Sequence, residues 1–301
     1  MNFLEIEFPL AGRDSETLAA ALEGLGALSV TFMDRGDEPV LEPLPGEVRL
    51  WSDTAVTALF DDSLSAEQRL AQLARHVAAD IAFHAQSRSV EDRVWEREWL
   101  KDWRPLQFGQ WLWVYPTDCD EPVPDGAVVV RLDPGLAFGT GTHATTAQCL
   151  DVLESMDLNG RSVIDYGCGS GILCIAALKL GAISAIGVDL DPQALLALSD
   201  NALRNGVSNK IHGQRVGESL AAADCVVANI LAKPHIDNAD LLSAACKVGG
   251  DLILSGILLE QTGQVLAAYA PGFDMVERRQ RDGWSCLWLR RRDPACFSPE
   301  I

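Results

Sequence analysis

The segment Ser162–Gly171, SVIDYGCGSG, joins a short apolar run to a glycine-rich turn, and the residues after it are typical of a helix. Glycine lacks a Cβ atom, so this turn can pass sharply from strand to helix and approach a ligand at contact distance. The segment therefore predicts a nucleotide-like cofactor held on backbone amides, with Gly167 and Gly169 as candidate contacts.

The spacing of the glycines and the next apolar run narrow the ligand. A dinucleotide fingerprint reads G-x-G-x-x-G, whereas here the third glycine from Gly167 falls one place early, at Gly171, and Ile172 holds the sixth position. The apolar run 184–188 ends in Asp189, where the second strand of a doubly wound sheet presents a carboxylate to ribose hydroxyls. A glycine loop with this acid suits an adenosyl group without a pyrophosphate. The alternative is an ordinary strand–loop–helix turn with a solvated aspartate.

Two further segments carry polar groups suited to a binding site. Residues 133–146 are rich in glycine and threonine, which predicts a loop that ends in a helix start with hydroxyls and free amides for an anion. His143 in this loop either accepts a proton through water or has a structural role. The run 224–229 ends a strand on Asn229, whose amide carbonyl can accept a hydrogen bond from an amine; the alternative is a loop-capping asparagine.

The back of the chain predicts a doubly wound α/β domain over residues 128–301, because strand-like runs alternate there with helical patterns. The predicted strands are 128–132, 162–166, 185–189, 211–216, 224–229, 251–255, 273–277 and 284–290.

The front of the chain, residues 1–90, predicts a small α+β unit. Apolar residues alternate with acids over 4–8, as in a half-buried strand, and Ser15 is expected to cap a helix. Extended runs are expected at 29–32 and 48–51. Ser65 and Gln68 form a capping box before a single helix with an apolar stripe from Leu70 to Ile81.

Residues 91–127 are expected to form a connecting helix and linker. Trp95, Trp99 and Trp103 are four residues apart and so share one helical face. Packing of the connecting helix explains them; the alternative is a ligand cage.

Composition favours a protein that works among basic partners. The 301 residues carry a net charge of −19, and the front unit holds 6 Lys and Arg against 15 Asp and Glu. An acidic surface repels phosphate backbones and attracts basic proteins. The arginines near the end, residues 278–292, are expected to form a solvated face. The 8 cysteines are scattered without metal-like or disulfide-like spacing, and no apolar run is long enough to span a bilayer, so we expect reduced thiols and a cytosolic location.

Taken together, the segments LDPGLAFGTGTHATT, VIDYGCGSGILCIAALKLGA with GVDLDPQAL, and VVANILAKPH resemble the bacterial ribosomal protein L11 methyltransferases. The resemblance runs through essentially the whole chain. It implies a doubly wound class I methyltransferase sheet with a small N-terminal α+β domain, and S-adenosylmethionine as cofactor. It also implies that Thr146 lies at the methionine end of the cofactor, Gly167 and Gly169 line it, Asp189 holds the ribose, and Asn229 binds beside the transferring methyl as the catalytic residue.

The resemblance further implies that the front unit captures ribosomal protein L11, whose N-terminal α-amine and lysine side chains are methylated. We expect a cytoplasmic monomer, since no heptad seam is present, with no metal, no membrane and no direct need for nucleic acid. Three alternatives remain open: another S-adenosylmethionine-dependent methyltransferase on the same fold, a non-catalytic ribosome-assembly factor, and a nicotinamide oxidoreductase.

Overall fold

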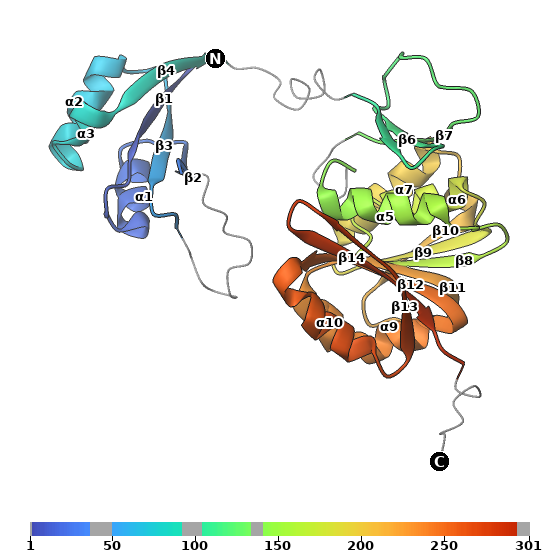
Figure 1. Ribbon diagram of the computed structural model, residues 1–301. Coiled ribbons are helices and arrows are strands. Elements are labelled where there is room, and N and C mark those ends of the chain that lie inside the picture. The colour runs from blue at the N-terminus through green and yellow to red at the C-terminus, as the bar shows by residue number, and fades with distance from the viewer. Residues whose placement is uncertain (1, 37–49, 92–103, 134–140, 294–301) are drawn as a thin grey trace. The chain divides into compact units, whose positions relative to one another are not determined.

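The computed structural model describes residues 2–36, 50–91, 104–133 and 141–293. The chain divides into two compact units, residues 1–98 and 99–301, which are described separately (Figure 1). The tryptophan-rich connecting helix predicted over 95–103 lies outside the described residues, as does most of the predicted loop 133–146.

The N-terminal unit is a four-stranded antiparallel sheet in the order β2-β3-β1-β4, with helices between the strands. Its elements are β1 (Asn2–Pro9), α1 (Ser15–Gly24), β2 (Ser29–Asp34), β3 (Thr54–Asp61), α2 (Ala66–His76), α3 (Ile81–His84) and β4 (Gln86–Glu91). This βαββαβ arrangement is the split βαβ motif. The predicted α+β unit is therefore confirmed.

The predicted β1 alternation is also confirmed, because Leu4, Ile6 and Phe8 are buried in the core of this unit. So is the capping box, in which Gln68 N donates to Ser65 Oγ (3.3 Å) and Ser65 N donates to Gln68 Oε1 (3.0 Å).

Three expectations for this unit are corrected. Asp14 caps α1 by accepting from Thr17 N at 2.9 Å, so Ser15 is the first helical residue and not the cap. The expected single helix ends at His76, and α3 begins only at Ile81. Of the extended run expected at 48–51, Leu50 and Trp51 lie outside any strand and 48–49 are not described; the strand is β3, whose β-branched residues fit a pleated surface.

The C-terminal unit contains a seven-stranded sheet in the order β10-β9-β8-β11-β12-β14-β13. The first five strands are parallel, and β14 runs antiparallel between β12 and β13. Its elements are α5 (Ala144–Ser155), β8 (Ser162–Tyr166), α6 (Ile172–Lys179), β9 (Ser184–Asp189), α7 (Pro192–Arg204), η2 (Ser208–Lys210), β10 (Ile211–Arg215), β11 (Ala223–Asn229), α8 (Ala232–Asp237), α9 (Ala239–Ala245), β12 (Cys246–Leu258), η3 (Leu259–Gln261), α10 (Thr262–Tyr269), β13 (Phe273–Arg281) and β14 (Trp284–Arg291). The doubly wound prediction is confirmed.

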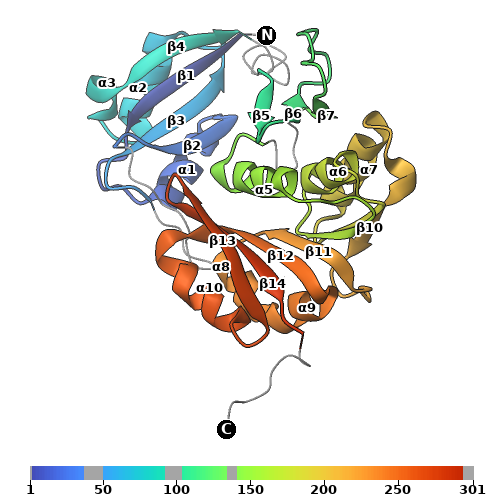
Figure 2. The same cartoon turned by 45° about the vertical axis from the view of Figure 1, so that its right-hand side comes forward.

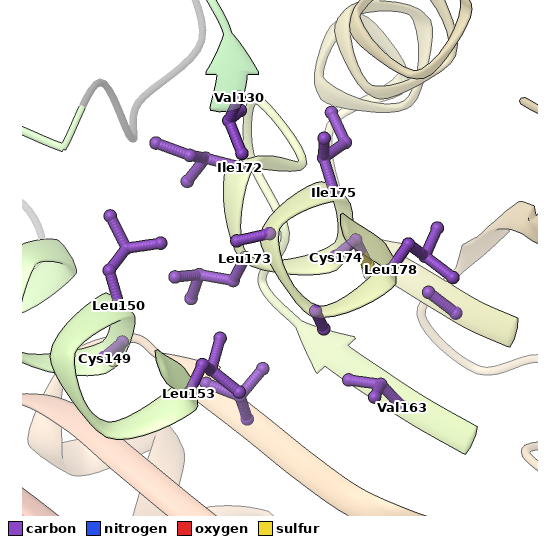
Figure 3. Close-up of a cluster of buried hydrophobic side chains, with 14 of the residues drawn as sticks. Val130, Cys149, Leu150, Leu153, Val163, Ile172, Leu173, Cys174, Ile175 and Leu178 are labelled. Carbon is purple, nitrogen blue, oxygen red and sulfur yellow. The ribbon is translucent and has the colours of Figure 1, made fainter. Parts of the chain in front are cut away.

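Helices cover both faces of this sheet: α5, α6 and α7 pack on one face, and α8, α9 and α10 on the other (Figure 2). Helix α6 is buried from Ile172 to Leu178, where its side chains meet those of α5 and the sheet (Figure 3). A helix that is apolar all round must be enclosed on every side. Its first turn, directly after the glycine loop, is thereby held in a fixed position.

Two expectations for residues 104–132 are corrected. The predicted linker contains β5 (Leu106–Phe108) and β6 (Leu112–Tyr115), and the predicted strand at 128–132 is β7 (Val128–Arg131). β7 pairs in parallel with β6 in a separate three-stranded sheet, not in the main sheet. This small sheet packs against α6, because Leu112 and Val130 bury their side chains in the same apolar cluster as that helix.

The remaining compositional expectations have simple outcomes within the described parts of the chain. None of the described helices is long and apolar enough to cross a bilayer. The cysteines that can be described are free thiols, and all of them except Cys119 are buried. Several of the arginines near the end form ion pairs on the β13–β14 hairpin and beside it, among them Arg279 with Glu277 and Arg290 with Asp251.

Candidate functional site

A cavity of about 440 Å³ lies at the carboxyl ends of the parallel strands in the C-terminal unit. This volume is within the range of small-ligand sites, and the carboxyl edge is where doubly wound sheets bind their ligands. Five residues predicted from the sequence line it together: Thr146, Gly167, Gly169, Asp189 and Asn229. The structure thus brings together residues from α5, from the loop after β8, and from the ends of β9 and β11.

The glycine loop is fixed to the neighbouring strand through its backbone. The amides of Gly167 and Cys168 donate to Val188 O at 2.8 and 3.0 Å. Gly167 has φ +80°, and a Cβ atom there would lie 2.4 Å from Ile230 Cγ2. Only glycine fits at this position, because both the left-handed backbone and the close approach of the β11 end exclude a side chain.

Asp189 at the end of β9 is oriented by main-chain amides. Its Oδ2 accepts from Gly169 N at 2.9 Å and its Oδ1 from Asp191 N at 3.0 Å. These bonds leave part of the hydrogen-bonding capacity of each oxygen for a ligand, since an ionised carboxylate has about four acceptor positions. The carboxylate is half-buried at the cavity wall. This position differs from the alternative, in which Asp189 would be a solvated aspartate on an ordinary turn.

Asn229 at the end of β11 is linked to helix α5. Its Nδ2 donates to Thr146 Oγ1 at 3.1 Å, and Thr146 is buried in the first turn of α5. The same turn is held to β12, since Ser255 Oγ donates to Thr145 O at 3.0 Å. The amide of Asn229 is therefore held at the cavity wall by its contact with α5.

His143 has a structural position. It is the N-cap of α5, with Nδ1 accepting from Thr145 N at 3.3 Å, and its ring packs edge-on against Trp284 with 5.3 Å between the ring centroids. It is not among the residues that line the cavity. These contacts favour the structural of its two expected roles.

The electrostatics of the cavity suit a ligand that carries positive charge. Its described lining contains no Lys, Arg or His, and Asp189 is its one carboxylate. Near the end of β8, beside the loop, Asp165 is fully buried. Burial raises its pKa to about 7, because this effect, together with the charge of Asp189, outweighs the hydrogen bonding from Cys174. A pyrophosphate would meet no cation in this lining.

The sequence reasoning missed the apolar residues that complete the cavity. Leu190, Val216 and Leu231 line it, and each comes shortly after the last residue of a parallel strand. Leu190 is 79% exposed and Leu231 50% exposed, so both present apolar surface at the cavity. Their place within two residues of the ends of β9, β10 and β11 was the available signal, because such positions meet at one edge of the sheet.

Comparison with known proteins identifies one family over nearly the whole chain. The family model described as "Ribosomal protein L11 methyltransferase (PrmA)" matches residues 2–292. Proteins named ribosomal protein L11 methyltransferase from Erwinia tasmaniensis and Klebsiella pneumoniae are 49% identical over 297 residues and 48% identical over 294 residues; each alignment covers 97% of this chain and 100% of the relative. The crystal structure of a ribosomal protein L11 methylase from Lactobacillus delbrueckii subsp. bulgaricus is 33% identical with a TM-score of 0.58, and the match covers 64% of this chain and 100% of that chain.

Proposed function

The chain belongs to the ribosomal protein L11 methyltransferase family, and from this premise we propose that it transfers methyl groups from S-adenosylmethionine to amines of ribosomal protein L11. The acceptors are the N-terminal α-amine and lysine ε-amines. The observation that carries the proposal is the cavity itself, in which the glycine loop, Asp189 and Asn229 meet and no described lining residue is basic.

The residues present fit this cofactor. The close approach of Gly167 to the end of β11 leaves bare main chain at the cavity wall, and Asp189 offers acceptors suited to a ribose diol. Leu190 and Val216 provide apolar surface for a base. The absence of a cation in the described lining favours a sulfonium over a dinucleotide pyrophosphate.

When bound, S-adenosylmethionine would supply a methyl carbon activated by its sulfonium. The bond from that carbon to sulfur would break as the amine nitrogen bonds to the carbon, and the electron pair of the broken bond would stay on sulfur and neutralise it. The protein's part is alignment, which is worth about 7–11 kcal/mol in well-oriented reactions. Asn229 accepts an N–H bond from the attacking amine, and the proton released afterwards passes to solvent.

The acceptor amine must be neutral to attack. An α-amine with a pKa near 8 loses its proton readily, whereas a lysine near 10.4 requires about 4–5 kcal/mol at pH 7. A dry cavity beside a sulfonium lowers this requirement, because two cations there repel each other. No strong general base is needed for this chemistry.

The N-terminal unit supplies substrate capture in this proposal. Its acidic composition, 6 basic against 15 acidic residues over 1–90, complements a basic ribosomal protein. Residues 91–127 join capture and catalysis, 128–301 form the methyltransferase domain, and the enzyme acts as a monomer in the cytoplasm.

The test is to incubate the purified chain with methyl-labelled S-adenosylmethionine and either purified ribosomal protein L11 or a ribosomal extract. We expect label in ribosomal protein L11, with mass spectrometry locating it on the N-terminus and lysines. Label in another protein or in RNA would indicate a different methyltransferase, and tight binding of the ribosomal protein without label would indicate an assembly factor.

A further inference from the structure

The cavity has a second polar group on the side of the sheet that α8 and α9 cover. Tyr166 at the end of β8 and Asn238 between α8 and α9 both line the cavity. Tyr166 belongs to the apolar cluster under these helices, and Val216 packs against the same cluster. Ile172, also in the lining, belongs instead to the cluster under α5 and α6. Asn238 therefore lies on the same side of the cavity as Val216, which provides surface for the base in the proposed function.

The amide of Asn238 is held in one orientation. Its Nδ2 donates to Pro234 O at 2.9 Å. A peptide carbonyl can accept a hydrogen bond but cannot donate one, so the flipped amide, with Oδ1 against Pro234 O, would place two acceptors together. The carbonyl oxygen Oδ1 is therefore the end of this amide that is left for other partners.

This carbonyl oxygen keeps hydrogen-bonding capacity. Tyr166 Oη donates to Asn238 Oδ1 at 3.5 Å, a long and therefore weak bond. An amide oxygen can accept two hydrogen bonds, and no other residue in the described parts of the chain donates to this one. Tyr166 is 6% exposed, and its hydroxyl has no further partner among the described residues. The two side chains thus offer uncharged oxygen acceptors, which suit a neutral N–H donor of a ligand.

We propose that Asn238 determines the base specificity of the cofactor site: its Oδ1 accepts a hydrogen bond from the exocyclic amine of adenine, with the Tyr166 hydroxyl as a second partner. This inference rests on the proposed function. Adenine carries an N–H donor at this position, whereas guanine and hypoxanthine carry a carbonyl oxygen. A carbonyl oxygen placed against Asn238 Oδ1 would leave both acceptors unpaired, which costs more than the loss of one hydrogen bond.

The test is calorimetry with S-adenosylhomocysteine and S-inosylhomocysteine, which carry an amine and a carbonyl oxygen at this position. We expect the wild type to bind S-adenosylhomocysteine about 30-fold more tightly. Asn238→Leu keeps the size of the side chain and removes the acceptor. It should weaken S-adenosylhomocysteine about tenfold and change S-inosylhomocysteine by less than about threefold, so that the preference falls to about threefold.

Two further variants sharpen the test. Tyr166→Phe removes one hydroxyl and should lower the preference about threefold. Asp237→Ala is the matched control, because Asp237 precedes Asn238, is exposed and pairs with Lys233 at 2.7 Å; both affinities should stay as in wild type.

The ratio of the two affinities separates specificity from a merely structural role. Equal weakening of both ligands in Asn238→Leu would overturn the inference, and so would a wild type that binds both equally. If Asn238→Leu kept the preference for adenine but lowered kcat with ribosomal protein L11, Asn238 would act on the acceptor amine and the inference would be wrong. If Asn238→Leu did not fold, an unchanged preference in Tyr166→Phe would overturn the inference. Wild-type protein that binds neither ligand would instead overturn the proposed function.

Discussion

The two edges of the seven-stranded sheet carry polar clusters of opposite kinds. At the carboxyl edge, Asp189 and Asn229 face a cavity and keep hydrogen-bonding capacity in reserve. At the amino edge, buried Asp251 accepts from Arg161 (2.6 Å), Arg290 (2.7 Å) and Trp288 (2.7 Å). The first arrangement can bind a ligand, and the second has already used its groups within the fold.

Asp224 shows the same saturation at the amino edge. Its carboxylate accepts from Ser162 N and Oγ (2.9 and 2.6 Å) and pairs with Lys247 (2.9 Å). Pockets alone would not separate the two edges, since about 300 Å³ of open volume also lies beside this cluster. What separates them is whether the polar groups are satisfied by the protein, which predicts loss of stability at one edge and loss of function at the other.

The largest effect is expected from Asp251→Ala at the amino edge. Removing this carboxylate leaves Arg161 and Arg290 without their buried partner, so the free energy of unfolding should fall by about 3–5 kcal/mol. Urea unfolding measures it, with Asp274→Ala as control, because Asp274 pairs with Arg292 while 67% exposed and should cost under about 1 kcal/mol. Unchanged stability of the Asp251 variant would contradict the assignment of this edge to stability.

Asn229→Ala should have the next largest effect, on turnover. Loss of the group that orients the amine should lower kcat about 100-fold, with the affinity for S-adenosylhomocysteine changed less than about threefold. Asn205→Ala serves as the matched control: it removes an amide that bonds Arg131 N and O (2.8 and 2.7 Å), so stability should fall and kcat persist. Equal losses of cofactor affinity and turnover in the Asn229 variant would argue against a separate role in catalysis.

Asp189→Ala should act on the cofactor instead. Losing hydrogen bonds to a charged acceptor should weaken S-adenosylhomocysteine binding about 10- to 30-fold by calorimetry, with kcat at saturating cofactor nearly unchanged. Asp157→Ala, an exposed aspartate just before β8, should leave binding as in wild type. A large fall in kcat at saturation would show that Asp189 does more than hold the ribose.

The smallest effect is expected when the pH is changed by one unit. The free energy of unfolding should then change by at most about 1.4 kcal/mol for one proton. Burial raises the pKa of Asp165 to about 7, so between about pH 4 and 7 the folded chain keeps a proton that the unfolded chain has lost. This group should therefore lower stability as pH rises through that window, and Asp165→Asn should remove the decline in urea titrations.

Asp224 should contribute the opposite slope. Burial by itself would raise the pKa of Asp224, but hydrogen bonds from Ser162 and the ion pair with Lys247 outweigh it and hold the pKa well below its usual range. Its contribution is present above about pH 4 and is lost as pH falls below that value. In Asp224→Asn the acid limb of the stability curve should flatten. If the two substitutions changed the slope of stability against pH in the same direction, the contrast between the edges would be refuted.

Much of the site could be predicted because its signals are local. Glycines at 167, 169 and 171 follow β8, and Asp189 and Asn229 are the last residues of β9 and β11. Parallel strands of a doubly wound sheet all end at one edge. The bond from Asn229 to Thr146 could not be predicted, since these residues are 83 positions apart and meet only through the packing of α5 on the sheet.

The errors in the fold have the same origin. The strand at 128–131 was recognised, but its partner β6 lies in the range 91–127, which the sequence predicted to be a connecting helix and linker. Hydrogen bonding between strands depends on residues distant in sequence, so a strand can be identified locally while its sheet cannot.

By itself, the sequence determined the two-unit α/β organisation, the glycine loop and the residues at the strand ends, because backbone preferences and apolar periodicity act over a few residues. Only the tertiary structure decided which polar groups are satisfied and which remain open to a ligand. The reason is that the hydrogen bonds of a polar group depend on partners brought in by packing. Arg161, Trp288 and Arg290 surround Asp251, whereas no residue in the described parts of the chain donates to Asn229 Oδ1.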